Sequence, residues 1–285
     1  MKWAERCLSS LRNSSVPCDV MAIDNNSTDG TQNFIHTHFP EVELIENKKN
    51  LGFGQANNIG LQRVLDENYK YAYLLNQDAW VMPDTLKKLI DTSETHPEYG
   101  VLSPMQIKAI SNHFEDKFRE HVLFRHQKFS PLLIEDMYFG MKKDIYEVSF
   151  VMAAHWLITA RCISIVGGFS PTFFHYGEDR NYLNRTNFWN FKIGIVPAAQ
   201  GVHDRGDSKW SPTKVMYVNE YIRILISSSN PLHKEALGKQ ITLLLKTGIR
   251  AREKDLIKYA FRLMKEKDIV ESNFAKSLNP RAFLS

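Results

Sequence analysis

Two patterns of apolar and polar residues alternate along the first half of the chain. Short apolar runs, which predict strands, are separated by longer segments whose apolar residues recur at helical spacing. The expected strands cover residues 19–23, 42–47 and 71–81, and the expected helices cover 2–12, 31–39, 53–68 and 84–97. Strands that alternate with helices are typical of βαβ units. The sequence therefore predicts an α/β fold, Rossmann-like, with a mainly parallel sheet flanked by helices.

The second half of the chain departs from this alternation. Residues 106–147 are rich in His, Phe and charge, and we expect an insertion there over one end of the sheet. A strand over 147–158, a helix near 161–166 and a strand over 191–199 follow. Beyond about residue 213 the pattern is helical and basic. These changes predict an α/β domain over 1–212 and a helical C-terminal extension over 213–285.

Composition fits a folded globular protein. The 285 residues are 43% apolar and 24% charged, no apolar run is long enough to cross a bilayer, and no signal peptide is evident at the N-terminus. Cys7, Cys18 and Cys162 are scattered and have no metal-binding spacing. An odd number of scattered cysteines favours a reduced, cytoplasmic protein.

Positive charge is concentrated at the C-terminal end. From Lys214 onward 14 Lys and Arg stand against 7 Asp and Glu, a net charge of +7, while the rest of the chain carries −3. A basic amphipathic segment is typical of a peripheral contact with an anionic membrane. The alternative is a solvated helical face. Nucleic acid is not an expected partner, since no nucleic-acid-binding signature is present.

Two polar clusters follow predicted strands. Asp24 opens the first, over residues 24–30, and Asn76, Gln77 and Asp78 form the second. In open α/β sheets, ligands bind in the crevice beyond the carboxyl ends of the strands. An Asx turn with a helix cap explains the first cluster equally well, and an acid in a turn before Pro83 is ordinary.

The segment Gly52-x-Gly54 begins a glycine-rich turn before a predicted helix. It does not complete a dinucleotide-binding fingerprint, because Asn57 stands where the third glycine is required. By itself the turn indicates only a close approach of the backbone at Gly54.

Glu178 and Asp179 follow a glycine and four aromatic residues, 173–176. Acidic residues are favoured in the first turn of a helix, which is one explanation. The other is that one of them is a catalytic base beside an apolar wall, which would raise its pKa by desolvation. Packing in the core is the simpler expectation for at least one of Phe173 and Phe174.

The order of these pieces carries more information than any one of them. "IDNNSTDGT", "NLGFGQANNIG", "LLNQDAW", "GGFSPTFFHYGEDRNYLNR" and "IVPAAQGVHDRGDSKW" follow one another along the chain. In this order they resemble the family 2 glycosyltransferases, and more narrowly the rhamnosyltransferase-like branch. The resemblance covers residues 2–210.

The resemblance implies a GT-A fold, a nucleotide-diphosphate sugar donor, a divalent metal (Mg or Mn) and inversion at the anomeric carbon. By position, it implies that Asp24 contacts the donor base and Asn76 lies near the ribose, with Gly54 in the donor site. It also implies that Asp78 and His203 bind the metal. Asp179 matches the base, and Glu178 is its partner in the catalytic pair. A plain surface histidine is the alternative for His203.

General chemistry agrees with these roles. A sugar diphosphate leaves readily only when its growing charge is neutralised, and a cation held by a carboxylate does this. A carboxylate that takes the proton of the acceptor hydroxyl assists its attack. A single displacement needs one such base.

The sequence departs from the family pattern in three places. Asn181 stands where a further acid is common, although Arg185 matches the downstream arginine, and the metal motif has one carboxylate instead of two. The family also opens with a strand that this sequence lacks. We expect its loss to leave two strands with unpaired backbone groups, unless the native protein is longer or another segment fills the gap. A poorly active remnant is a further possibility.

These features predict a hexosyltransferase, in the narrowest case a rhamnosyltransferase, that transfers a sugar to a saccharide or lipid-linked saccharide acceptor. Assembly of a cell-surface polysaccharide of the O-antigen type, on the cytoplasmic side of the membrane, fits the basic extension. The alternative is a non-catalytic relative that binds a nucleotide sugar or glycan as a partner subunit. A sugar nucleotidyltransferase is disfavoured, because the N-terminal arginine-containing glycine-rich loop of those enzymes is missing.

Overall fold

The computed structural model describes residues 2–111, 113–124, 129–205 and 212–285. The N-terminal part forms α1 (Ala4–Arg12), β1 (Met21–Asp24), α2 (Thr31–His38), β2 (Glu43–Glu46), α3 (Phe53–Asp66), β3 (Tyr71–Leu75), β4 (Ala79–Val81) and α4 (Thr85–Thr95). The middle forms β5 (Tyr99–Ile107), α5 (Asp116–Phe118), the π-helical segment η1 (Arg119–Phe124), α6 (Phe129–Tyr138), β6 (Tyr146–Glu147), β7 (His155–Thr159) and α7 (Ala160–Val166). The remainder forms α8 (Glu178–Phe188), β8 (Lys192–His203), α9 (Pro212–Ser228), α10 (Leu237–Ala251) and α11 (Lys254–Ser277).

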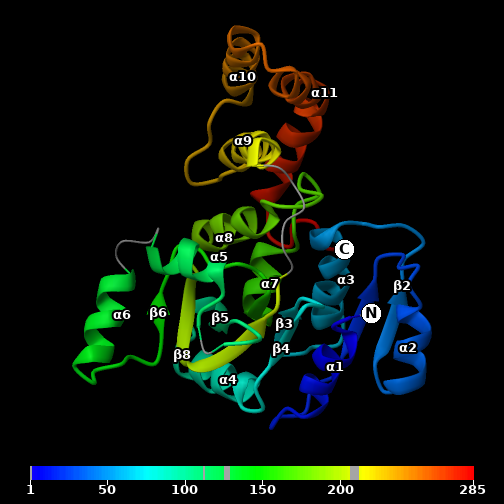
Figure 1. The fold of residues 1–285 in the computed structure, drawn as a ribbon, viewed down its shortest axis with the longest axis vertical. Coiled ribbons are helices and arrows are strands. Elements are labelled where there is room, and N and C mark those ends of the chain that lie inside the picture. Colours follow the sequence, from blue (N-terminus) through cyan, green and yellow to red (C-terminus); the bar gives the residue numbers. More distant parts are fainter. Residues whose placement is uncertain (1, 112, 125–128, 206–211) are drawn as a thin grey trace.

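A six-stranded sheet forms the centre of the molecule (Figure 1). Its strands lie in the order β3-β7-β5-β8-β4, and β6 pairs with β8 as well. The α/β architecture with a central sheet is confirmed. The prediction of a mainly parallel sheet is wrong: β5 and β8 are parallel, but β3–β7, β5–β7, β4–β8 and β6–β8 are antiparallel. Apolar periodicity identifies strands but not their direction, which depends on the connections.

Two predicted strands differ from the structure, and one strand of the structure was not predicted. The run 71–81 is two strands, β3 and β4, because residues 76–78 leave the sheet and turn the chain. The run 147–158 forms a strand only at its two ends, in β6 and β7. β5 was not predicted, because it is buried along most of its length and contains Pro104, so it has neither alternation nor an uninterrupted pattern.

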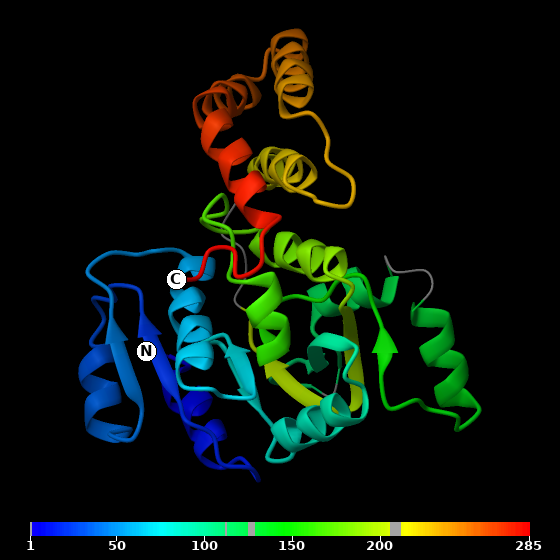
Figure 2. The same ribbon diagram turned by 180° about the vertical axis from the view of Figure 1, so that it is seen from behind.

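Helices cover both faces of the central sheet (Figure 2). On one face α3, α7 and α8 pack in the main core, in contact with Trp156 and Ile158 of β7. On the other face α4 packs against β5 and β7, where it contacts Leu157. Successive residues of β7 thus point to opposite faces, as strand geometry requires.

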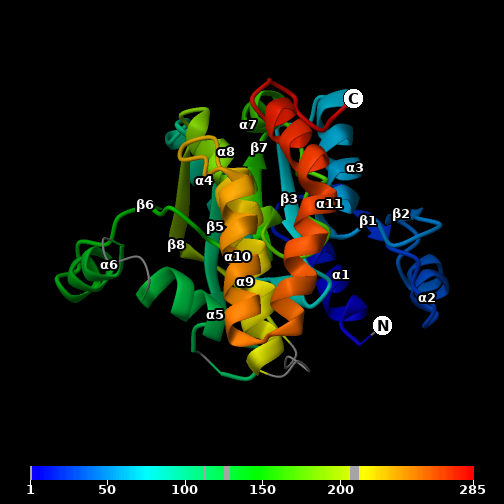
Figure 3. The same ribbon diagram turned by 90° about the horizontal axis from the view of Figure 1, so that it is seen from above.

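A second sheet lies beside the first and contains only β1 and β2, which are parallel (Figure 3). Within the residues described, β1 pairs with β2 alone, and β3 pairs with β7 alone. Both strands therefore have one edge without a partner strand. That a missing strand accounts for these edges stays a prediction.

The C-terminal helices α9, α10 and α11 form a layer next to α8 with its own apolar core (Figure 1). The chain end then returns to the α/β core, where Gly168 N donates to Ala282 O at 2.8 Å and Arg281 N donates to Ile165 O at 3.2 Å. The helical C-terminal region is confirmed. The boundary between 212 and 213 stays a prediction, and residues 206–211 beside it lie outside the described residues.

The predicted insertion over 106–147 contains α5, η1, α6 and β6, with residues 112 and 125–128 outside the described residues. None of the helices in the described ranges combines the length and the apolar character that a membrane crossing demands. The α10–α11 pair exposes the large apolar side chains of Leu243, Ile249 and Phe261 among basic residues. Membrane contact through this region stays a prediction.

Candidate functional site

The sheet register pairs the ends of four strands around one turn of the chain. Leu75, the last residue of β3, pairs with His155 at the start of β7. Ala79, the first residue of β4, pairs with His203 at the end of β8. The turn that carries Asn76 and Asp78 lies between these two pairs. The second predicted polar cluster is therefore adjacent to both histidines.

Asp78 and His203 face each other. Asp78 Oδ1 lies 3.5 Å from His203 Nε2, and Asp204 N donates to the backbone oxygen of Asp78 at 2.8 Å. His203 is only 2% exposed, and its Nδ1 has no hydrogen-bond partner in the described part of the chain. Burial raises the pKa of Asp78, but the hydrogen bond and charge of His203, with the charge of Arg205, outweigh burial and lower it. Asp78 is therefore a carboxylate at neutral pH.

His155 was not predicted from the sequence. It lies at the start of β7, and its ring is next to the backbone of Val202, the residue before His203. The Tyr73 hydroxyl lies 2.8 Å from Nδ1, and Val202 O lies 3.0 Å from Nε2. Because a carbonyl oxygen only accepts, Nε2 carries the proton and Nδ1 accepts from Tyr73. Burial lowers the pKa of His155 to about 4, so the ring is neutral. A Cβ on Gly201 would lie 2.7–3.0 Å from the ring, so this glycine makes room for His155.

Arg205, which was also not predicted, acts through its charge on both Asp78 and Asp179 of the acidic pair. Its charge lowers the pKa of Asp78 and opposes the rise in the pKa of Asp179. Arg205 Nε lies 3.7 Å from Oε1 of the buried Glu115. A cation two residues after His203 was the available signal in the sequence. The rest of that motif, residues 206–210, lies outside the described residues.

The acidic pair opens α8. Gly177, at the N-cap, has a φ of 91°, a left-handed conformation that favours glycine. Glu178 is 7% exposed, and its Oε2 has no hydrogen-bond partner among the described residues. Burial, followed by the charge of Asp179, raises the pKa of Glu178 to about 8.

Asp179 is half-buried, and its Oδ1 accepts a hydrogen bond from Arg180 N at 2.7 Å. Burial raises its pKa, whereas the Arg180 backbone and the charges of Arg180 and Arg205 oppose the rise. The cationic neighbours favour the charge on Asp179, and Glu178 is protonated at neutral pH. At neutral pH, Asp179 can thus be a carboxylate while Glu178 is a neutral carboxylic acid.

Of the aromatic residues before Glu178, some are buried in the core and others are exposed at the surface. Phe173 is buried in the core of the C-terminal helices, as expected for at least one of the two phenylalanines. Phe174 is 57% exposed and Tyr176 is 49% exposed. Phe174 lies against Gly52 at the start of α3. Two exposed rings thus precede the acidic pair in the chain, and one of them lies at the start of α3.

The three predicted donor-binding residues have structural contacts of their own. Asp24 Oδ2 accepts from Ser27 N at 3.0 Å and from Gln32 Nε2 at 2.8 Å, so its carboxylate holds the turn after β1. The Asx turn considered as the alternative for this cluster is at Asp29, whose Oδ1 accepts from Thr31 N at 3.2 Å. A Cβ on Gly54 would lie 2.7 Å from Phe169 Cβ, so this glycine allows α3 to pack closely. Asn76 O accepts from Cys7 Sγ at 3.7 Å. Donor contact by Asp24, Gly54 and Asn76 stays a prediction.

Arg185 of α8 is buried and binds the backbone at the end of α7. It donates to Val166 O at 2.8 Å, to Gly168 O and to Asn181 Oδ1 at 3.3 Å. Asn181 Nδ2 donates to Ser229 O at 3.2 Å, a bond that a carboxylate cannot make. The departure at Asn181 thus has a physical reason: its amide joins α8 to the end of α9.

No group of three or more His, Cys, Asp and Glu side chains in the described ranges is arranged to hold a metal. Asp78 and His203 are the predicted pair of ligands that the structure brings together. An oxygen and an imidazole nitrogen suit Mn²⁺, and further ligands would have to come from the donor or from water.

Comparison with known proteins identifies the family. The family model described as "Glycosyl transferase family 2" matches residues 2–155. N-acetylglucosaminyl-diphospho-decaprenol L-rhamnosyltransferase of Mycobacterium tuberculosis is 24% identical over 225 residues, which cover 72% of this chain and 72% of that protein. Low-salt glycan biosynthesis hexosyltransferase Agl10 of Haloferax volcanii is 22% identical, with 74% of this chain and 67% of that protein covered.

The fold is similar to that of a solved mannosyltransferase from Pyrobaculum calidifontis in complex with GDP-Man and Mn²⁺. The TM-score is 0.54 at 15% identity, and the match covers 97% of this chain and 70% of that chain. This similarity confirms the predicted GT-A fold class. The predicted rhamnosyltransferase-like branch is supported by the similarity to the two transferases of Mycobacterium tuberculosis and Haloferax volcanii. The chain belongs to glycosyl transferase family 2 and is a glycosyltransferase.

Proposed function

We propose that this glycosyltransferase is inverting and metal-dependent, and that it moves a hexose, in the narrowest case rhamnose, from a nucleotide-diphosphate donor to a saccharide hydroxyl. One observation carries the proposal. Asp78 and Asp179 come from distant parts of the chain, and both lie within electrostatic reach of Arg205, while His203 faces Asp78 at 3.5 Å. The charge of one arginine thus acts on both the predicted metal ligand and the predicted base, which supports their joint role in one site.

Asp78 and His203 would hold the divalent cation. Their fit is supported by the ionised state of the Asp78 carboxylate and by the position of a buried imidazole nitrogen beside it. A bound cation would neutralise the charge that develops on the leaving nucleotide diphosphate. Mn²⁺ in the Pyrobaculum enzyme, which has a similar fold, adds support.

Asp179 would take the proton of the acceptor hydroxyl as the hydroxyl attacks the anomeric carbon. Glu178, protonated at neutral pH, does not compete for that proton, and its neutrality spares the site a second negative charge. Arg205 would attract the anionic diphosphate towards Asp78, since it is held in place by buried Glu115. A single base is sufficient for an inverting displacement.

The test is turnover of a set of UDP, dTDP and GDP sugars by the parent protein, Asp78→Ala and Asp179→Asn, with Mn²⁺ present. We expect both variants to transfer sugar at least about a hundredfold more slowly, the scale of general-base catalysis. Glu94→Gln, an exposed change on α4, is the control and should leave the rate unchanged. Equal, measurable rates in the parent and the two site variants would refute the assignment of Asp78 and Asp179. No turnover of any donor by the parent would favour the alternative of a non-catalytic binding subunit.

A further inference from the structure

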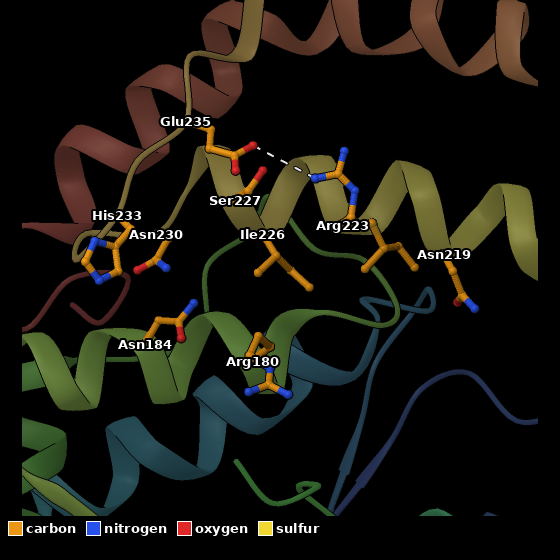
Figure 4. A pocket seen from close by; sticks show the side chains of 10 residues that line it. Arg180, Asn184, Asn219, Arg223, Ile226, Ser227, Asn230, His233 and Glu235 are labelled. Carbon is orange, nitrogen blue, oxygen red and sulfur yellow. Dashed lines mark ion pairs between the residues drawn. The ribbon is translucent and has the colours of Figure 1, made fainter. Parts of the chain in front are cut away.

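A cavity of about 530 Å³ lies between α8 and α9, outside the strand-end cluster (Figure 4). This volume is within the range of roughly 300–1,000 Å³ that is typical of small-molecule sites. Its walls come from α8, from α9 and from the loop that follows α9. The C-terminal helices therefore form half of a cavity whose other half is the helix that carries Glu178 and Asp179.

The lining combines an apolar strip with amide and hydroxyl groups. Ile222 and Ile226 lie one turn apart on α9 and both line the cavity. Asn219 lines it from the same helix, as Figure 4 shows. Asn184 approaches from α8, and Asn230 from the loop. Amide side chains both donate and accept hydrogen bonds, so they suit hydroxyl groups. A sugar ring presents hydroxyl groups at its edge and C–H groups on its faces. The amides of the lining suit the hydroxyl groups, and the two isoleucines suit the C–H groups.

The cavity begins next to the proposed base. Arg180, the residue after Asp179, lines it. A Cβ on Gly177 would lie 2.9 Å from Ile222 Cγ2, so α9 packs directly on the turn before Glu178. The hydrogen bond from Asn181 to Ser229 O fixes the end of α9 to α8. The cavity, the α8–α9 groove, thus lies where α9 packs on the first turns of α8, and its lining starts with the residue after the acidic pair.

Charge in the groove is largely balanced within the protein. Arg223 lies 2.8 Å from Glu220 and 3.9 Å from Glu235, and Arg180 stacks over the Phe150 ring at 3.6 Å. Because Arg223 already has two carboxylate partners, the groove is polar without being strongly cationic. This balance favours a neutral polyhydroxyl ligand over a phosphate.

We propose that the α8–α9 groove binds the saccharide acceptor, so that the C-terminal helices supply one wall of the acceptor site. The inference rests on the proposed function, since it places the attacking hydroxyl at Asp179. The groove would hold the sugar residue that bears this hydroxyl, with its face on Ile222 and Ile226. Asn184 and Asn219 would bind hydroxyl groups from opposite walls.

Saturation-transfer NMR tests the groove directly. The probes are the methyl glycosides of glucose, galactose, mannose, N-acetylglucosamine and rhamnose, each added to the protein with a nucleotide diphosphate and Mn²⁺. We expect at least one glycoside to receive saturation, and we expect Asn184→Ala with Asn219→Ala to weaken its binding about fivefold or more, the effect of losing two hydrogen bonds. Asn219→Ala alone, at an exposed position, keeps the test available if the double variant is unstable.

Asn33→Ala, an exposed change on α2 outside the groove, is the matched control and should leave glycoside binding unchanged. The thermal shift given by the nucleotide, measured on the same samples, reports separately on the donor site of the proposed function. If the nucleotide shift is present but no glycoside receives saturation, the groove proposal is wrong and the donor site stands. Equal glycoside binding by the parent and the groove variants would overturn it as well.

Discussion

At the scale of single residues, the acidic pair is the feature with the clearest energetic consequence. Glu178 is buried, and burial with the charge of Asp179 raises its pKa to about 8, whereas a glutamate in an unfolded chain titrates near a pH of about 4.3. The folded protein therefore binds this proton more tightly than the unfolded chain does. Below the unfolded pKa the group causes no loss of stability. As the pH rises from there to about 8, the free energy of unfolding falls.

Glu178→Gln should remove this pH-dependent loss, because the amide has the shape of the protonated acid and cannot ionise. We expect the variant to unfold at nearly the parent's urea concentration at pH 5. At pH 9 it should be more stable than the parent by roughly 2–5 kcal/mol, since each tenfold difference in proton affinity between the folded and unfolded chain corresponds to about 1.4 kcal/mol. Glu94→Gln, on the exposed face of α4, is the control. A Glu178→Gln effect of the same size at pH 5 and pH 9 would contradict the burial of a protonated Glu178.

The sequence predicted some of the residues that the structure brings together and missed others for a common reason. Asp78 and His203 were predicted as a pair, and the structure brings them within 3.5 Å. His155 was not predicted, because an isolated histidine in an apolar run carries no signal until the β3–β7 register places it beside the pair. Arg205 was missed because its importance lies in its reach to Asp179, which only the folded chain reveals.

At the scale of elements, local patterns predicted the helices well and the strand pairings poorly. Amphipathic spacing in α3 and α4 depends only on residues within each helix. Strand direction depends on distant connections, and β5 is buried on both faces, so its sequence has no alternation. β1 and β2 form a two-stranded sheet of their own. A pair of strands by itself is marginal in water, so this sheet depends on α2 for its stability.

The β1–β2 sheet should be the first part of the sheet structure to open. Hydrogen exchange followed by mass spectrometry should show amides of β1 and β2 exchanging well before those of β5 and β7. The expected reason is that β5 lies between two partner strands in the main core, whereas β1 has one partner among the described residues. Protection of β1 equal to that of β5 would mean that its open edge is covered in solution.

At the scale of the whole molecule, α8 joins the proposed catalytic pair to the proposed acceptor groove. Its first turn carries the acidic pair, and its outer face meets α9. The chain end, after passing through α11, returns to the α/β core beside Gly167 and Gly168. The C-terminal helices are thus anchored at both ends over the site, so a substrate bound in the groove and a donor at the strand ends would be held in a fixed relation.

The central claim is that Asp78 and His203 complete a metal-dependent donor site, and nucleotide binding tests it most directly. The melting temperature of the parent and of Asp78→Ala should be measured with UDP, dTDP and GDP, each with and without Mn²⁺, and with Mn²⁺ alone. A nucleotide at about a hundredfold its Kd stabilises by roughly 2.7 kcal/mol, which raises the melting temperature of a chain this size by about 5 °C or more. We predict such a shift in the parent with at least one nucleotide, only when Mn²⁺ is present, and its loss in Asp78→Ala. The absence of any shift in the parent, or a shift that survives both metal removal and Asp78→Ala, would contradict the claim.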